Sequence, residues 1–98
     1  MIEKNLTVNN AAGFHVRVAS CVCKTAAKYD SAVKLCKGSY EADCKSCLDL
    51  LGLMCPQGES LNLKVEGADE KQAFDAIEQL FEHKFYEDEY ASSAPADL

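Results

Sequence analysis

The stretch LNLKVEGADEKQAFDAIEQLFEHK, residues 61–84, contains the clearest strand and the clearest long helix in the sequence. Apolar and polar residues alternate over residues 61–66, as in a strand with one buried face. Asp69 is the expected N-cap of the following helix, with Gln72 three residues later as in a capping box. The helix is predicted to run to about residue 84, with an apolar stripe of Phe74, Ile77, Leu80 and Phe81.

Shorter elements precede this unit. They are predicted to be a strand at 2–8, a helix at 16–29, strands at 31–37 and 40–43, and a short helix from 46 to 51 or 53. Gly38-Ser39 predicts a tight hairpin turn, and Ser46 with Asp49 has capping-box spacing, with the Asp49 carboxylate reaching back to the N-cap. The order βαββαβα with short hairpins predicts an α+β open-faced sandwich: a four-stranded antiparallel sheet with three helices on one face.

The length of 98 residues fits one domain. We expect this domain at residues 1–85 and an acidic, disordered C-terminal tail at 86–98. The chain contains no apolar run as long as a membrane span, and its N-terminus lacks the apolar core of a signal peptide. We therefore expect a cytoplasmic monomer without membrane insertion.

Charge is distributed unevenly along the chain. Residues 1–65 contain eight basic and six acidic residues, whereas residues 66–98 contain two basic and ten acidic residues. The acidic second part argues against nucleic acid or an anionic membrane as a partner. The mildly basic first part suits phosphate or an acidic protein surface.

Six cysteines would suggest disulfides in a secreted protein, but cytosolic thiols stay reduced. Cys21 and Cys23 lie two apart on one predicted helix and do not face each other, and we predict Cys23 and Cys36 to be buried small apolar residues. No four-ligand zinc site can be assembled, so no metal is expected. A thiol or metal function at Cys44-x-x-Cys47 remains a minor alternative, and Cys47, at a helix start beside Lys45, is the candidate reactive thiol.

Residues 13–20, GFHVRVAS, contain the strongest candidate for chemistry. They place His15 in the loop just before a helix whose first backbone N–H groups lack intrahelical partners. Those groups and the helix dipole form an anion site, and the guanidinium of Arg17 suits phosphate oxygens. This combination is what a phosphohistidine requires, although His-x-Arg alone is also compatible with an ordinary polar residue near a helix start.

The same residues resemble the active-site segment of the HPr family, the histidine-containing phosphocarrier proteins of the bacterial phosphoenolpyruvate:sugar phosphotransferase system. That segment usually reads Gly-Leu-His-Ala-Arg-Pro-Ala-Ser. The similarity continues without a gap through Lys45-Ser46 to residues 66–70, EGADE, and the last helix. It covers roughly residues 1–85, and the predicted order of elements is also that of the family.

The resemblance implies a function for this loop. The Nδ1 atom of His15 would accept a phosphoryl group from phospho-enzyme I, which phosphoenolpyruvate has charged, and would pass it to a sugar-specific IIA domain. Arg17 would neutralise charge on the group, and the backbone amides of Val16 and Arg17 would hold it. The protein would need no cofactor and would be a stoichiometric carrier rather than a turnover catalyst.

The resemblance also implies a regulatory site and a docking surface. Ser46 matches the serine that an HPr kinase/phosphorylase modifies in many bacteria, and the serine is a good N-cap in either case. Docking on enzyme I and IIA domains would use an apolar patch with a basic rim, made of Cys47, Leu48 and Leu51 with Lys24 and Lys45.

Three residues depart from the family pattern. Val18 replaces the proline, Val16 replaces a small residue, and Phe14 replaces leucine. These changes imply a similar site with altered preorganisation. The alternative function is therefore a regulatory HPr-like interaction module, controlled by phosphorylation at Ser46, in which the transfer role has weakened.

Overall fold

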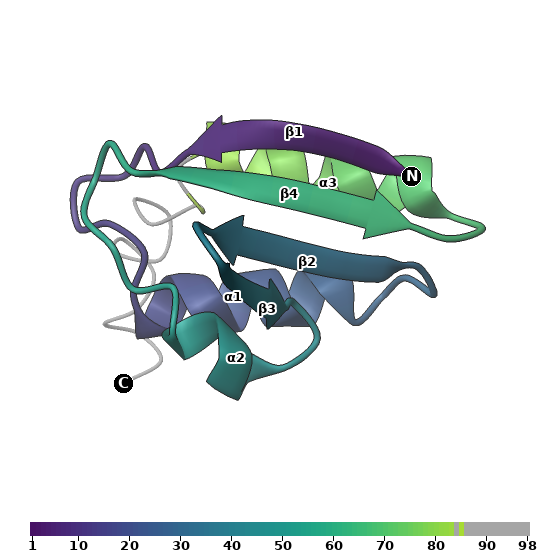
Figure 1. The fold of residues 1–98 in the computed structure, drawn as a ribbon, viewed down its shortest axis with the longest axis horizontal. Helices are drawn as coiled ribbons and strands as arrows, with labels where there is room; N and C mark the ends of the chain where they lie inside the picture. Colours follow the sequence, from purple (N-terminus) through teal and green to yellow (C-terminus); the bar gives the residue numbers. More distant parts are fainter. Residues whose placement is uncertain (84, 86–98) are drawn as a thin grey trace, which may run out of the picture.

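The computed structural model describes residues 1–83 and residue 85 (Figure 1). Its elements follow the predicted order: β1 (Ile2–Thr7), α1 (Val16–Ala26), β2 (Ala32–Lys37), β3 (Tyr40–Asp43), α2 (Cys47–Leu51), β4 (Ser60–Glu66) and α3 (Glu70–Glu82). The predicted tail at 86–98 lies outside the described residues. Within the described part of the chain, no helix is long and apolar enough to span a membrane.

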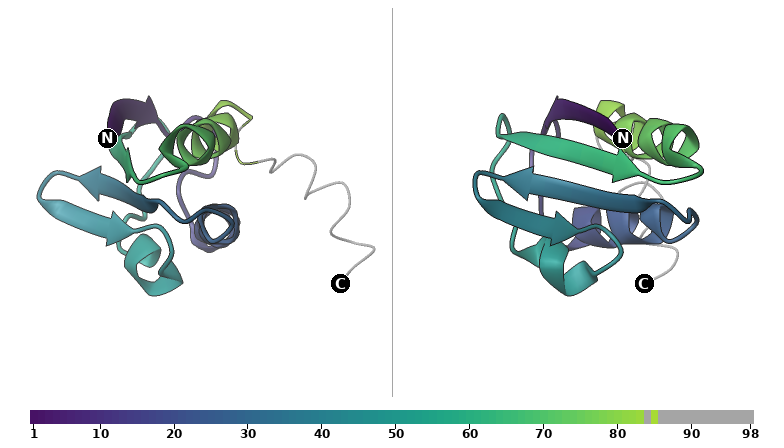
Figure 2. Two further views of the ribbon diagram at one scale, coloured as in Figure 1. Left: turned by 90° about the vertical axis from the view of Figure 1, so that its right-hand side faces the viewer. Right: turned by 45° about the vertical axis from the view of Figure 1, so that its right-hand side comes forward.

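The four strands form one antiparallel sheet in the order β1-β4-β2-β3. Strand β4 is central because it pairs with β1 on one side and β2 on the other. Its alternating residues Leu61, Leu63 and Val65 are fully buried, as the sequence pattern predicts. Helices α1 and α3 cover one face of the sheet, while α2 lies against α1 and β3 at the end of the sheet (Figure 2). The open-faced sandwich is thus confirmed.

Helix α1 ends earlier than predicted. Its last residue is Ala26, with Ala27 as the C-cap, whereas the prediction placed the end near Tyr29. The amides of Lys28 and Tyr29 donate to carbonyls only three residues back, at Thr25 and Ala26. This is the tighter hydrogen bonding typical of a helix end, so the chain leaves the helix one turn early.

The predicted capping box of α3 is wrong. Asp69 occupies the N-cap position but makes no side-chain capping bond. Its carboxylate instead accepts hydrogen bonds from the backbone amides of Asp30 and Ser31, both at 2.9 Å, and from the Ser31 hydroxyl. The carboxylate of Glu70, the first residue of α3, accepts a hydrogen bond from the Gly67 amide at 3.2 Å, two residues before the N-cap. Asp69 thereby fastens the start of α3 to the chain that enters β2.

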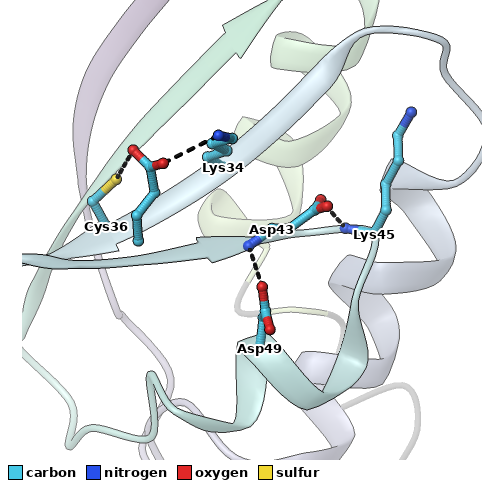
Figure 3. Close-up of polar contacts among 6 residues, drawn as sticks. Lys34, Cys36, Asp43, Lys45 and Asp49 are labelled. Atoms are coloured by element: carbon cyan, nitrogen blue, oxygen red, sulfur yellow. Dashed lines mark hydrogen bonds and ion pairs between the residues drawn. The ribbon is translucent and has the colours of Figure 1, made fainter.

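The capping box of α2 is confirmed only in part. Ser46 Oγ accepts a hydrogen bond from the Asp49 amide at 3.3 Å, as predicted. The Asp49 carboxylate does not reach back to Ser46; it accepts from the Asp43 amide at 3.2 Å (Figure 3). The Ser46 amide donates to the Asp43 carbonyl at 2.9 Å, so its hydrogen bond is already made.

The burial of the cysteines also differs from the prediction. Cys23 and Cys36 are half-buried, whereas Cys44 and Cys55 are buried. Cys36 lies on the open face of the sheet, where its thiol contacts the Glu41 carboxylate at 3.7 Å (Figure 3). Cys36 follows the buried Leu35 in β2, so the alternation of the strand directs its side chain to the uncovered face.

Candidate functional site

The loop before α1 is fixed in place by Gly13. Its φ of +79° is a left-handed conformation that side chains disfavour. A Cβ atom here would overlap the carbonyl oxygen of Cys55 and lie 3.0 Å from the Cα of Pro56. The Gly13 amide donates to the Asn10 carbonyl at 3.1 Å, and the Asn10 side-chain amide donates to the Gly13 carbonyl at 2.6 Å. Only glycine fits this crossing of the two loops.

Phe14 attaches the loop to the core. It forms an isolated antiparallel bridge with Cys55, with N···O distances of 2.8 Å from the Phe14 amide and 3.3 Å from the Cys55 amide. Its ring is buried and meets the ring of Phe85 edge-on, with centroids 6.1 Å apart. Sequence reasoning missed this bridge because it joins residues that are 41 positions apart and follows no local pattern. The residue before His15 is therefore held rigidly.

His15 is the N-cap of α1. Its backbone is extended, and its carbonyl accepts the first helical hydrogen bond from the Ala19 amide at 2.8 Å. Its side-chain Nδ1 accepts a hydrogen bond from the Arg17 amide at 3.3 Å. A nitrogen that accepts a hydrogen bond carries a lone pair, so the ring proton of the neutral imidazole lies on Nε2. The Nδ1 lone pair thus faces the start of the helix.

The first turn of α1 carries positive charge and no negative charge. The first turn of α1 contains no acidic residue, and it includes the exposed Arg17. Val16 is 62% exposed, so the helix start is open to solvent. The N–H groups of the first turn, the positive end of the helix dipole and the Arg17 guanidinium together favour a bound anion. The arrangement can hold a phosphoryl group on a histidine nitrogen.

The residues predicted to dock partners are distributed over α1 and α2. Leu48 is 81% exposed, Cys47 is also exposed, and Leu51 is half-buried. Lys24 and Lys45 are exposed, but the Lys45 ammonium donates to the Tyr29 carbonyl at 2.7 Å. Its charge is therefore directed toward the chain that follows α1.

One exposed apolar residue of this region was not predicted. Met54 is 52% exposed and lies just after α2. A methionine in a loop has no periodicity to mark it, so only its solvent exposure identifies it. Ser46, the predicted regulatory residue, is half-buried at the start of α2.

The described residues contain no group of three His, Cys, Asp or Glu side chains that could hold a metal ion. All six cysteines are free thiols.

Comparisons with known proteins agree with this geometry. The family model described as "PTS HPr component phosphorylation site" matches residues 2–83. Phosphocarrier protein HPr of Treponema pallidum (strain Nichols) is 36% identical over 90% of this chain and 100% of its own length. Phosphocarrier protein HPr of Xylella fastidiosa (strain Temecula1) is 34% identical over 90% of this chain and 99% of its own.

A solved structure shows the same fold. The crystal structure of HPr from Thermoanaerobacter tengcongensis superposes with a TM-score of 0.82 at 33% identity, covering 87% of this chain and 96% of the other. The matched region includes the loop, α1 and α2 described above. The chain therefore belongs to the HPr family, the phosphocarrier proteins of the phosphotransferase system.

Proposed function

We propose that His15 is the phosphoryl-accepting residue of this carrier. It receives the group from phospho-enzyme I in the cytoplasm and passes it to a sugar-specific IIA domain. The observation that supports this most directly is the hydrogen bond from the Arg17 amide to His15 Nδ1, because it places a nucleophilic lone pair at an anion-binding helix start.

The transfer step follows from this geometry. The Nδ1 lone pair attacks the phosphorus of the donor phosphohistidine, an N–P bond forms on His15, and the N–P bond of the donor breaks. The phosphoryl oxygens then accept hydrogen bonds from the Val16 and Arg17 amides in place of the imidazole nitrogen. The Arg17 guanidinium balances their charge. The same steps in reverse order pass the group to the IIA histidine.

Docking is proposed to use the exposed surface beside the histidine. Leu48 and Cys47 provide an apolar centre, with the half-buried Leu51 at its edge. Arg17 and Lys24 provide positive charge that suits acidic partner surfaces. A small apolar centre with a charged rim is typical of short-lived complexes, as a relay carrier requires.

The deciding experiment is phosphorylation of the full chain by enzyme I and phosphoenolpyruvate, followed by intact mass. We expect one acid-labile phosphate per chain, and none on His15→Ala. The matched control is His83→Ala, which removes the exposed histidine at the C-cap of α3 and should be phosphorylated normally. Phosphate retained on His15→Ala, or lost from His83→Ala, would contradict the assignment of His15.

A second candidate function is regulation through Ser46 by an HPr kinase/phosphorylase. It is favoured by the position of the hydroxyl, which is half-exposed and accepts from the Asp49 amide at the start of α2. The carboxylates of Asp43 and Asp49 are hydrogen-bonded to backbone amides around this turn (Figure 3). A phosphate added here would repel them and shift the start of α2.

The test of this candidate uses ATP and a purified HPr kinase. Regulation requires an acid-stable phosphate that is absent from Ser46→Ala, and phosphoryl transfer to His15 that is slower in the modified chain. Modification of Ser46 without any change in transfer would argue against a regulatory role.

A further inference from the structure

We propose that Tyr40 is a positioning residue for the docking surface, because its hydroxyl holds α2 in place. Helix α2 carries the proposed docking residues Cys47, Leu48 and Leu51. Tyr40 acts through the position of this helix and has no part in the anion site at His15. The consequence for phosphoryl transfer rests on the proposed function, whereas the effect on α2 does not.

Helix α2 depends on contacts with the rest of the fold. It has five residues, Cys47–Leu51, and a helix this short is not stable by itself in water. Among these five described residues, Leu50 is the one that is buried. The helix packs against α1 and β3. Its position must therefore come from these neighbours.

Asp49 joins α2 to both ends of β3. The Asp49 carboxylate accepts a hydrogen bond at 3.2 Å from the amide of Asp43, the last residue of β3 (Figure 3). The Asp49 carbonyl accepts a hydrogen bond at 2.6 Å from the hydroxyl of Tyr40, the first residue of β3. Two bonds to opposite ends of one strand restrict both the rotation and the sliding of the helix against the sheet.

The Tyr40 bond also completes the hydrogen bonding at the C-terminal end of α2. The last carbonyls of a helix lack partners in the following turn. The Asp49 carbonyl accepts from the Gly52 amide at 3.1 Å, and the Tyr40 hydroxyl is its second donor. A carbonyl oxygen has two lone pairs, so both bonds can form at once.

Gly52 leaves the space that the tyrosine occupies. It is the C-cap of α2, with a φ of −69° that any residue can adopt. A Cβ atom here would lie 2.5 Å from the Tyr40 hydroxyl oxygen and 2.7 Å from the ring carbon that carries it. The ring is 41% exposed, so an alanine at this position would push it toward solvent. The bond to Asp49 would then break without disturbance of the core.

Loss of the Tyr40 hydroxyl should loosen α2 and leave the chemistry at His15 unchanged. One hydrogen bond of ordinary net strength corresponds to about fivefold in an equilibrium constant, so α2 should open about fivefold more often. Docking requires α2 in place, so the apparent affinity falls with the fraction of chains in that state. We expect the KM of enzyme I for the chain to rise about two- to fivefold at unchanged kcat.

The test compares Tyr40→Phe, which keeps the ring, with Glu41→Gln in the full chain. Glu41 is the matched control because it lies on the opposite face of β3, where its carboxylate pairs with Lys34 at 3.1 Å. The Leu50 amide donates to the Ser46 carbonyl at 3.1 Å, so its hydrogen exchange reports the opening of α2 without any partner. We expect about fivefold faster exchange in Tyr40→Phe, with the rise in KM, and neither change in Glu41→Gln.

Gly52→Ala breaks the same contact from the other side. It should reproduce the faster Leu50 exchange and the higher KM of Tyr40→Phe. In the Gly52→Ala background, Tyr40→Phe should have no further effect, because the bond to Asp49 is already lost.

Several results would overturn the positioning role. They are exchange and KM in Tyr40→Phe that match Glu41→Gln, faster exchange without a rise in KM, or a loss of kcat at unchanged KM. A full effect of Tyr40→Phe in the Gly52→Ala background would also overturn it, because the hydroxyl would then act elsewhere than at Asp49. Failure of the proposed function is distinguishable. If enzyme I does not phosphorylate the unmodified chain, the docking consequence is refuted, and the exchange rates still decide whether Tyr40 holds α2.

Discussion

The two long helices begin in opposite ways, although each faces the same problem of unpaired N–H groups. At the start of α3 the chain supplies its own carboxylates. Glu70 accepts from the Gly67 amide and pairs with the N-terminal ammonium at 3.1 Å, while Asp69 binds the chain entering β2. At the start of α1 the cap is the imidazole of His15, and the first turn contains no acidic residue.

The difference determines which helix start can bind an anion. Carboxylates at α3 complement the helix dipole with charge that belongs to the protein, so this end is closed to another anion. The α1 start keeps its positive potential, and Arg17 adds to it. It is also held in position by backbone, through Gly13 and the Phe14 bridge, rather than by charged side chains. Because backbone contacts hold this loop in position, its side chains do not have to support the fold and can take part in chemistry.

The largest effect is expected from breaking the backbone support of the α1 start. Gly13→Ala places a Cβ against the Cys55 carbonyl in a left-handed conformation. We expect the free energy of unfolding to fall by about 3 kcal/mol, measured by urea denaturation. Gly38→Ala is the matched control, since Gly38 has a φ of +59° with open space around it. It should cost only about 1 kcal/mol.

If both alanine variants lose the same stability, the close approach at Gly13 contributes nothing beyond its backbone conformation, and the loop is not held as described.

The next effect comes from making the α1 start resemble that of α3. Val16→Glu adds a carboxylate at an exposed first-turn position. It should favour the helix by about 0.5 kcal/mol but repel the incoming phosphoryl group. We expect phosphorylation by enzyme I to slow by a factor of about ten or more. The measurement is the initial rate followed by intact mass.

Val16→Gln has the same shape without the charge and should remain close to the unmodified rate. If Val16→Gln slows transfer as much as Val16→Glu, the effect is steric, and the potential at the α1 start is not what the phosphate uses.

A smaller effect, confined to acid, is expected at the α3 start. Hydrogen bonds from Ser31 and Asp30 hold the pKa of Asp69 below its ordinary value of 3.8, and the Gly67 amide lowers that of Glu70 below 4.5. Depressed folded-state pKa values mean that this stability is complete above the ordinary values and is lost as pH falls through the folded ones. The free energy of unfolding should therefore decline below about pH 4.

Asp69→Asn keeps an acceptor oxygen but cannot titrate. In urea denaturation it should show a weaker decline below about pH 4. An unchanged pH profile in this variant would mean that Asp69 does not couple α3 to β2 through its charge.

Much of this contrast could be predicted from sequence, and the remainder depends on tertiary contacts. The alternation over β4 and the stripe of α3 are local patterns, so the fold followed from them. The position of His15 before a helix is also local. Asp69 is the N-cap as predicted, but its capping bond is absent because its carboxylate binds Asp30 and Ser31, which lie 39 and 38 positions away.

The smallest effect is expected at Val18, where the family carries proline. Val18 is the third residue of α1, within the first turn, where a missing N–H breaks no helical hydrogen bond and the φ angle of proline suits the helix. Val18→Pro should therefore fold normally. Reduced freedom of the unfolded chain adds about 0.5 kcal/mol, while the buried valine side chain loses some packing against the core. We expect the unfolding midpoint to move little and the transfer rate to change less than about threefold, since His15 Nδ1 and the Arg17 amide are already aligned.

A rate increase of tenfold or more would show that proline supplies preorganisation that Gly13 and the Phe14 bridge do not. The backbone support of this loop would then be incomplete without the proline.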